Sequence, residues 1–197
     1  MSHPVREISK QSDSPNRRKT IAAQLGIVFI TTGGSIDKSY SPHVSSFEVA
    51  DPVLQDVLND GLVEFTYEVK PIFKKDSLEM TIEDRQKIRR TVEGRKERRI
   101  IITHGTDTIV ETGLFLKGIK DKVIVLTGAF TPIRFKHTDA VLNLGMAIAA
   151  VQTLPPAVYV AINGTVSPIE SLHKDVESQV FRFETRENRS LIAGQNR

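Results

Sequence analysis

The sequence has no cysteine and no tryptophan, and only 6% of its residues are aromatic. Without cysteine, the chain forms no disulfide, holds no zinc ion through thiolates and has no cysteine nucleophile. No apolar run approaches the roughly 20 residues that span a bilayer, and residues 1–11 contain no apolar segment that resembles a signal peptide. From these absences we expect a cytoplasmic protein with no membrane span.

The net charge of +3 belongs to one end of the chain. Residues 1–20 contain 5 basic and 2 acidic residues, and subtracting these from the totals of 27 and 24 leaves 22 of each sign. A nucleic-acid partner would need a basic face on the folded body. The segment Arg85–Arg99 is basic but has no interleaved aromatic residues, which favours a solvated helix face and loop. The sequence therefore predicts no nucleic-acid partner.

Two parts of the chain differ in composition. Residues 1–20 are polar and rich in serine, which predicts a disordered tail. Residues 21–197 have the apolar and charged content of a soluble globular protein and are long enough for a core of their own. We expect them to form a single domain.

Within that domain, short runs of branched apolar residues alternate with helical patterns. The strands expected from these runs are Leu25–Thr32, Leu62–Phe73, Arg99–Thr103, Lys122–Thr127 and Ala157–Ile162. The expected helices are a short one within Ser45–Asn59 with Pro52 at its first position, Thr81–Glu93, Thr106–Lys117 and Thr138–Gln152. Residues 166–183 are expected to form a hairpin or a final strand. This alternation predicts an α/β fold, a doubly wound and mostly parallel sheet with helices on both faces, as in Rossmann-like and flavodoxin-like three-layer sandwiches.

The helix expected over Thr81–Glu93 has the clearest local signals. Thr81 can cap its N-terminus, with Asp84 three residues further on. Ile82, Ile88 and Val92 are expected on its buried side.

Two loops carry most of the functional signal. Thr31–Ile36 reads Thr-Thr-Gly-Gly-Ser-Ile and follows a buried apolar run, and Thr103–Thr108 reads Thr-His-Gly-Thr-Asp-Thr and follows another. Glycines let the backbone approach a ligand closely. Ligands of open α/β sheets bind beyond the carboxyl ends of the strands. The two loops are therefore predicted to be two halves of one site.

Each loop also has a plainer interpretation. Gly-Gly-Ser is common in a tight turn with a helix cap, and Thr106 or Asp107 can cap the helix that follows. In the functional interpretation, Ser35 is a nucleophile exposed on a rigid turn, beside backbone N–H groups that bind an oxyanion. Asp107 would then pair with a substrate ammonium, and Thr106 would handle a proton or water.

The two motifs, in this order, resemble those of the asparaginase/glutaminase family, the bacterial type I and II L-asparaginases. That family's motifs read Thr-Gly-Gly-Thr-Ile and His-Gly-Thr-Asp-Thr. The resemblance continues through Lys75–Met80, Leu126–Leu144 and Val160–Lys174, so that it covers nearly all of Ile21–Glu177.

The resemblance implies an amidohydrolase that converts L-asparagine to L-aspartate and ammonia through an acyl-enzyme, with no metal or cofactor. It assigns the catalytic roles to Ser35, Tyr40, Thr106, Asp107 and Lys174. In that assignment Ser35 attacks and the lysine supports Thr106. The substrate-binding residues that it implies are Gly34, Ser77, Leu78, Gly105, Thr106 and Asp107. Its implied partners are a small amino-acid substrate and further copies of the chain, in a homodimer or homotetramer.

The chain departs from the family pattern in three ways. Ser35 lacks the β-methyl group of the family's threonine, and Leu78 replaces a glutamine that contacts substrate. The chain also ends at Arg197, which implies a short form without the family's second domain and its glutamate. Two alternatives stay open: hydrolysis of another small amide such as glutamine or D-asparagine, and amino-acid binding without turnover. The set of Thr106, Asp107 and Lys174 favours an enzyme.

Overall fold

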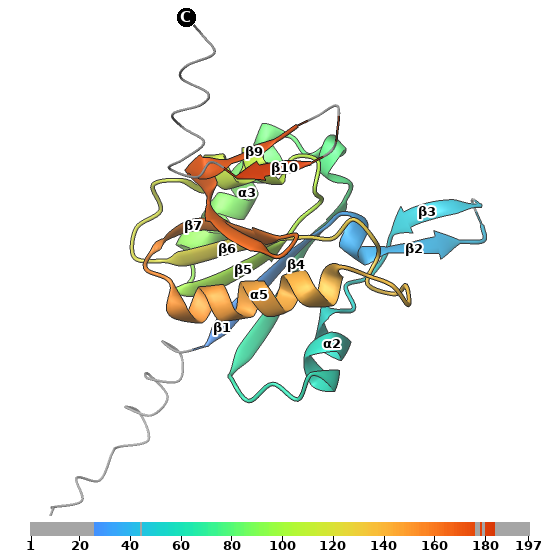
Figure 1. Cartoon of the computed structure of the whole chain (residues 1–197), viewed down its shortest axis with the longest axis horizontal. Coiled ribbons are helices and arrows are strands. Elements are labelled where there is room, and N and C mark those ends of the chain that lie inside the picture. Colours follow the sequence, from blue (N-terminus) through green and yellow to red (C-terminus); the bar gives the residue numbers. More distant parts are fainter. Residues whose placement is uncertain (1–25, 44, 176–177, 179, 184–197) are drawn as a thin grey trace, which may run out of the picture.

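A six-stranded sheet forms the centre of the computed structural model, which describes residues 26–43, 45–175, 178 and 180–183 (Figure 1). The strand order is β4-β1-β5-β6-β7-β8. The strands are β1 (Ile27–Gly33), β4 (Tyr67–Lys75), β5 (Arg99–Thr103), β6 (Val123–Thr127), β7 (Ala157–Ile162) and β8 (Thr165–Pro168). All neighbouring strands pair in parallel except β7 and β8, which are antiparallel.

Helices cover both faces of the sheet. They are α2 (Leu54–Asp60), α3 (Ile82–Glu93), α4 (Ile109–Leu116) and α5 (Ala140–Thr153). Helices α3 and α4 pack on one face, and α2 and α5 pack on the other, so that α2 and α5 lie below the sheet in Figure 1. The predicted doubly wound, mostly parallel three-layer fold is confirmed.

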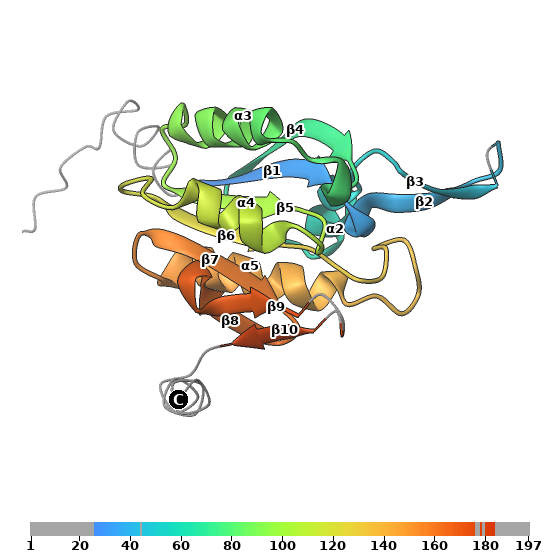
Figure 2. The same ribbon diagram turned by 90° about the horizontal axis from the view of Figure 1, so that it is seen from above.

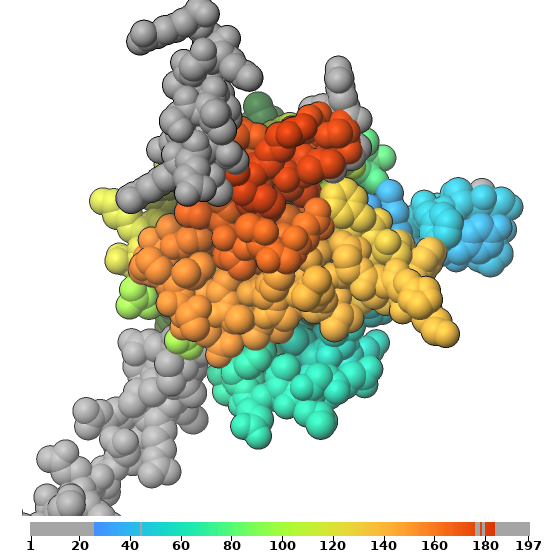
Figure 3. Space-filling model, viewed as in Figure 1, coloured from blue at the N-terminus to red at the C-terminus, as the bar shows by residue number. Residues whose placement is uncertain are grey.

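Two small hairpins lie outside the main sheet. Strands β2 (Lys38–Ser41) and β3 (Ser46–Val49) pair antiparallel and project from the body on the side where β1 ends (Figures 2 and 3). Strands β9 (Leu172–Lys174) and β10 (Phe181–Phe183) form the second hairpin. Residues 166–183 were expected to form a hairpin or a final strand, and the structure has both, since β8 is the last strand of the main sheet and β9 and β10 form the hairpin. The β2–β3 hairpin was not predicted.

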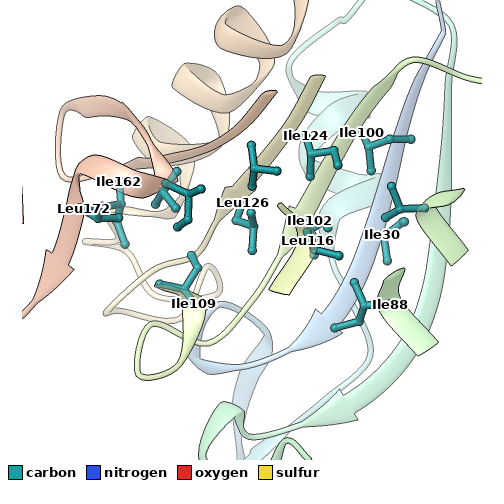
Figure 4. Close-up of a cluster of buried hydrophobic side chains, with 14 of the residues drawn as sticks. Ile30, Ile88, Ile100, Ile102, Ile109, Leu116, Ile124, Leu126, Ile162 and Leu172 are labelled. Carbon is teal, nitrogen blue, oxygen red and sulfur yellow. The ribbon is translucent and has the colours of Figure 1, made fainter. Parts of the chain in front are cut away.

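The core has two layers because successive strand residues point to opposite faces of the sheet. Ile100 and Ile102 of β5 pack with Ile88 of α3 in the layer drawn in Figure 4. Ile101, between them, packs in the other layer with Leu144 of α5. Since both faces are covered, the central strands β1, β5, β6 and β7 consist of nearly continuous apolar runs, whereas the edge strands β4 and β8 contain polar residues as well.

Several predicted element boundaries are wrong. Strand β4 begins at Tyr67 rather than Leu62, because Tyr67 pairs with Ile27, the first residue of β1. Val63 and Phe65, however, do pack on the predicted face. Helix α2 begins at Leu54, so the proline at position 52 precedes the helix. Helix α4 begins at Ile109 after Thr108, so neither Thr106 nor Asp107 is its N-cap residue.

Helix α3 follows the prediction at its start and departs from it on its buried face. Thr81 and Asp84 form the expected capping box. Ile88 and Val92 are buried, but Ile82 is 61% exposed. Arg85 takes the buried position instead, because residues 85, 88 and 92 follow the i, i+3, i+7 spacing of one helix face. The prediction of a solvated Arg85–Arg99 segment is therefore wrong for Arg85.

The predicted tail of residues 1–20 lies outside the described residues. In the part of the chain that the structure describes, no helix combines the length and the apolar character that crossing a bilayer requires.

Candidate active site

The two motif loops meet where the order of the parallel strands reverses. From β1 the chain passes to β4 on one side and later to β5 on the other, so the switch point lies between β1 and β5. Each motif begins in the last residues of one of these two strands and continues into the loop at its carboxyl end. Open α/β sheets bind ligands in the crevice at this point.

Gly34 brings the two loops into backbone contact. A Cβ atom on Gly34 would collide with the Cα and N atoms of Gly105. Gly34 also has a φ of +87°, which a residue with a side chain rarely adopts. Its N–H donates to the Lys75 carbonyl at 2.9 Å, which ties the loop to the end of β4 as well. The predicted two halves of the site therefore touch.

A third loop, from the end of β4, contributes Ser77. A Cβ atom on Gly105 would collide with the Ser77 hydroxyl, so this serine packs directly on the second motif. Ser77 is 1% exposed, and its Oγ has no hydrogen-bond partner within the described ranges. The Thr108 hydroxyl donates to the Ser77 carbonyl at 2.8 Å and holds the loop in place. Leu78, the next residue, is 74% exposed.

Lys174 reaches the second motif from β9. Its Nζ lies 2.6 Å from Asp107 Oδ1, and only 7% of the lysine side chain is exposed. Thr106, beside this pair, is also buried. The resemblance made Lys174 a support for Thr106, whereas the ion pair that the structure forms joins it to Asp107. The fold thus brings together residues that are 67 positions apart in the sequence.

The first motif carries Ser35 and leads into the projecting hairpin. Ser35 opens a short 3-10 helix, η1 (Ser35–Asp37), and is half-buried. Tyr40 lies on β2, is 56% exposed and packs its ring against Phe47. Lys38, on the same strand, forms an ion pair with Asp76 at 2.7 Å, which connects the hairpin to the loop that carries Ser77.

Two buried titratable residues beside the motifs, Asp37 and His104, were assigned no catalytic or binding role from the sequence. Burial raises the pKa of Asp37 to about 7, although the charge of Arg134 opposes this shift. Burial lowers the pKa of His104 to about 4. The only sequence signal for either residue was its place inside or next to a motif, because burial depends on the tertiary structure.

The histidines were predicted to be local structure rather than metal ligands. His104 is fully buried, and its ring Nδ1 lies 2.8 Å from the Gly105 carbonyl oxygen. Across residues 26–43, 45–175, 178 and 180–183, no group of three or more histidine, aspartate and glutamate side chains could hold a metal ion.

The sequence matches the family described as "Asparaginase, N-terminal" over residues 26–195. The chain belongs to the asparaginase family. Both motif loops, the Ser77 loop and Lys174 lie inside the matched range.

Individual members of the asparaginase family support this assignment. A probable periplasmic L-asparaginase of Haemophilus influenzae is 29% identical over an alignment of 195 residues that covers 93% of this chain and 53% of that protein. A glutaminase-asparaginase of Acinetobacter glutaminasificans is 27% identical over an alignment of 176 residues that covers 80% of this chain and 52% of that one. The crystal structure of a probable cytoplasmic L-asparaginase from Campylobacter jejuni has a TM-score of 0.63 and 28% identity, over 76% and 48% of the two chains. The chain thus spans about half the length of these relatives.

Proposed function

We propose that this chain hydrolyses the side-chain amide of L-asparagine to L-aspartate and ammonia, through a covalent intermediate on Ser35. The observation that carries the proposal is the backbone contact between Gly34 and Gly105 at the switch point. This contact sets the loop of Ser35 beside the loop of Thr106 and Asp107. The L-asparaginase and glutaminase-asparaginase names of the relatives support the substrate class.

The amino-acid end of the substrate would be held by Asp107 and Ser77. The Asp107 carboxylate is 34% exposed, so it is open to the α-ammonium group. The Ser77 hydroxyl is buried without a partner among the described residues, which costs about 1–3 kcal/mol unless a ligand satisfies it. A donated hydrogen bond to the α-carboxylate would remove that cost. The substrate ammonium would also compete with Lys174 for Asp107 and free the lysine to act on Thr106.

The reaction has two steps. Ser35 Oγ forms a bond to the amide carbon, the C–N bond breaks, and the nitrogen leaves as ammonia with the proton of the serine hydroxyl. Tyr40 is the proposed carrier of that proton. Water, oriented by Thr106 and Lys174, then adds to the ester, and its proton returns to Ser35 Oγ as aspartate leaves. Such proton transfers contribute about 10²–10⁴ in rate.

The test measures ammonia release from L-asparagine by the full chain and by two variants at one position. Ser35→Ala removes the nucleophile and should lower release by at least about a thousandfold. Ser35→Thr is the matched control, because it keeps the hydroxyl and adds the β-methyl that restricts its rotamer. We expect the threonine variant to be active. An alanine variant that releases ammonia as fast as the parent would remove Ser35 from the mechanism.

A substrate panel separates this proposal from its alternatives. L-Glutamine and D-asparagine, assayed in parallel, test whether the apolar Leu78 shifts the preference to another small amide. Leu78→Gln restores the polar group of the family pattern and should move the preference toward L-asparagine. Aspartate binding in a calorimeter without turnover of any amide would identify a binding protein instead.

We further infer that the chain acts in the cytoplasm as a homodimer or homotetramer. The Campylobacter relative is named cytoplasmic and the Haemophilus one periplasmic, so cell fractionation is the direct test. Val141 and Leu142 of α5 are 56% and 59% exposed, and they supply apolar surface for an interface. Sedimentation equilibrium would measure the mass, and a monomer at all concentrations would contradict the assembly.

A further inference from the structure

A series of buried hydrogen bonds between side chains ends at the second motif. His104 is fully buried and immediately precedes Gly105. Its ring Nδ1 lies 2.8 Å from the Gly105 carbonyl oxygen. Because a carbonyl oxygen only accepts, Nδ1 carries the hydrogen, and Nε2 of the neutral ring is then an acceptor.

Thr112 and Arg85 continue the series of hydrogen bonds from Nε2 of His104. The Thr112 hydroxyl, fully buried on α4, lies 2.8 Å from Nε2 of His104. Arg85 Nε lies 3.2 Å from the same hydroxyl. A guanidinium group only donates, so the Thr112 hydroxyl accepts from Arg85. Because Nε2 of the neutral ring carries no hydrogen, the hydroxyl donates its own proton to His104. The bonds therefore all run from Arg85 through Thr112 and His104 to Gly105.

Arg85, the first residue in this series of hydrogen bonds, is held by several partners. Arg85 Nη1 donates to the Met80 carbonyl at 2.9 Å, and Nη2 pairs with Glu111 at 2.8 Å. Only 8% of Arg85 is exposed. A planar guanidinium group with several partners has one preferred orientation, so its Nε–H points in a fixed direction. The anchor joins α3 to α4, since Arg85 lies on the first and Glu111 on the second.

We propose that His104 is a positioning residue for the amide hydrolysis. The series of hydrogen bonds from Arg85 through Thr112 and His104, here called the relay, fixes the orientation of the Gly105–Thr106 peptide. The inference rests on the proposed function. The C=O and N–H of a trans peptide point in opposite directions. A Gly105 carbonyl held toward His104 therefore fixes the Thr106 N–H on the opposite side of the loop.

The relay acts on Thr106 more than on Asp107. Asp107 is held by its ion pair with Lys174 in the free protein, and in the complex the substrate ammonium would take the place of the lysine. Loss of the relay should therefore lower kcat and leave KM nearly unchanged. Burial and the charge of Arg85 both lower the pKa of His104, to about 4, so the ring is neutral around pH 7 and its hydrogen stays on Nδ1.

A pair of substitutions at Thr112 separates the hydroxyl from packing. Thr112→Val keeps the shape and removes the donor to His104, and Thr112→Ser keeps the donor. One lost hydrogen bond corresponds to about tenfold in rate. We expect kcat for L-asparagine to fall about tenfold in the valine variant, with KM within about twofold, and to recover in the serine variant. Thr153→Val, the same change at an exposed hydroxyl of α5, is the control.

A second measurement needs neither turnover nor a variant. The ¹⁵N shifts of the His104 ring in the wild-type protein should report a hydrogen on Nδ1 and none on Nε2 between about pH 6 and 8. A hydrogen on Nε2 would overturn the relay. Equal loss of kcat in both Thr112 variants, or no loss in the valine variant of an active enzyme, would also overturn it and leave Ser35 untouched. Absence of ammonia release from the wild type would instead contradict the proposed function, and the ring shifts would still decide the relay.

Discussion

Replacing Asp37 with asparagine is expected to stabilise the protein by an amount that grows as the pH rises. Asp37 lies in η1, two positions after Ser35, and is 4% exposed. Its Oδ2 has no hydrogen-bond partner among the described residues. Burial raises its pKa from 3.8 to about 7, so the folded state holds this proton more tightly than the unfolded state does.

The size of the effect follows from the two pKa values. Below 3.8 the carboxyl is protonated in both states, and between 3.8 and about 7 the unfolded state loses its proton first. Stability therefore falls as the pH rises through this window and is level above it. At about 1.36 kcal/mol for each pH unit, the complete loss is roughly 4 kcal/mol. Between about pH 4.5 and pH 8, the loss of stability is about 3 kcal/mol.

Urea unfolding of the wild type and of Asp37→Asn at these two pH values measures the effect. The difference between the two free energies of unfolding cancels every other titrating group, and its change between the two pH values also cancels every pH-independent effect of the amide. Between the lower and the higher pH, we expect the variant to gain about 3 kcal/mol in free energy of unfolding relative to the wild type. Asp56→Asn, the same change at an exposed position of α2, is the control. A difference that stays within about 0.5 kcal/mol would refute the burial argument, because the carboxyl would then be solvated or paired.

Two further predictions concern the site itself. Gly34→Ala should lower the free energy of unfolding by at least about 2 kcal/mol and abolish ammonia release, because the new Cβ collides with Gly105 and the positive φ is strained. Gly118→Ala, with a similar φ of +86° but open space around it, should cost only the strain, about 1 kcal/mol, and keep the activity. Lys174→Met should lower kcat by about a hundredfold or more, while thermal unfolding checks that the variant is folded. Unchanged turnover in that variant would exclude the lysine from the reaction.

The sequence predicted the central strands of the sheet well because they are buried on both faces. Ile100, Ile101 and Ile102 need no alternation, and a run of branched apolar residues is enough to identify such a strand. The β2–β3 hairpin was missed for the opposite reason. Its residues are largely exposed and polar, and Tyr40 and Phe47 pack on each other rather than on the core. The start of α4 was also misplaced, because contacts with Ser77 hold the loop before it.

The candidate site was predictable as a set of residues but not as a set of contacts. The motifs identified both loops, yet the pairing of Lys174 with Asp107 depends on where the fold places β9. Arg85 was assigned to a solvated face on charge alone. Its buried position and its bonds to Thr112 depend on the packing of α3 against α4, which no local pattern specifies.

The central claim is that the loops of Ser35 and of Thr106 and Asp107 form one site for a small amino acid. A crystal structure of the protein with L-aspartate, the proposed product, tests it most directly. We predict the α-ammonium group at the Asp107 carboxylate, the α-carboxylate at the Ser77 hydroxyl, and the side-chain carboxylate within hydrogen-bond distance of Ser35 Oγ. Aspartate bound elsewhere, or bound with its side chain away from Ser35, would contradict the account.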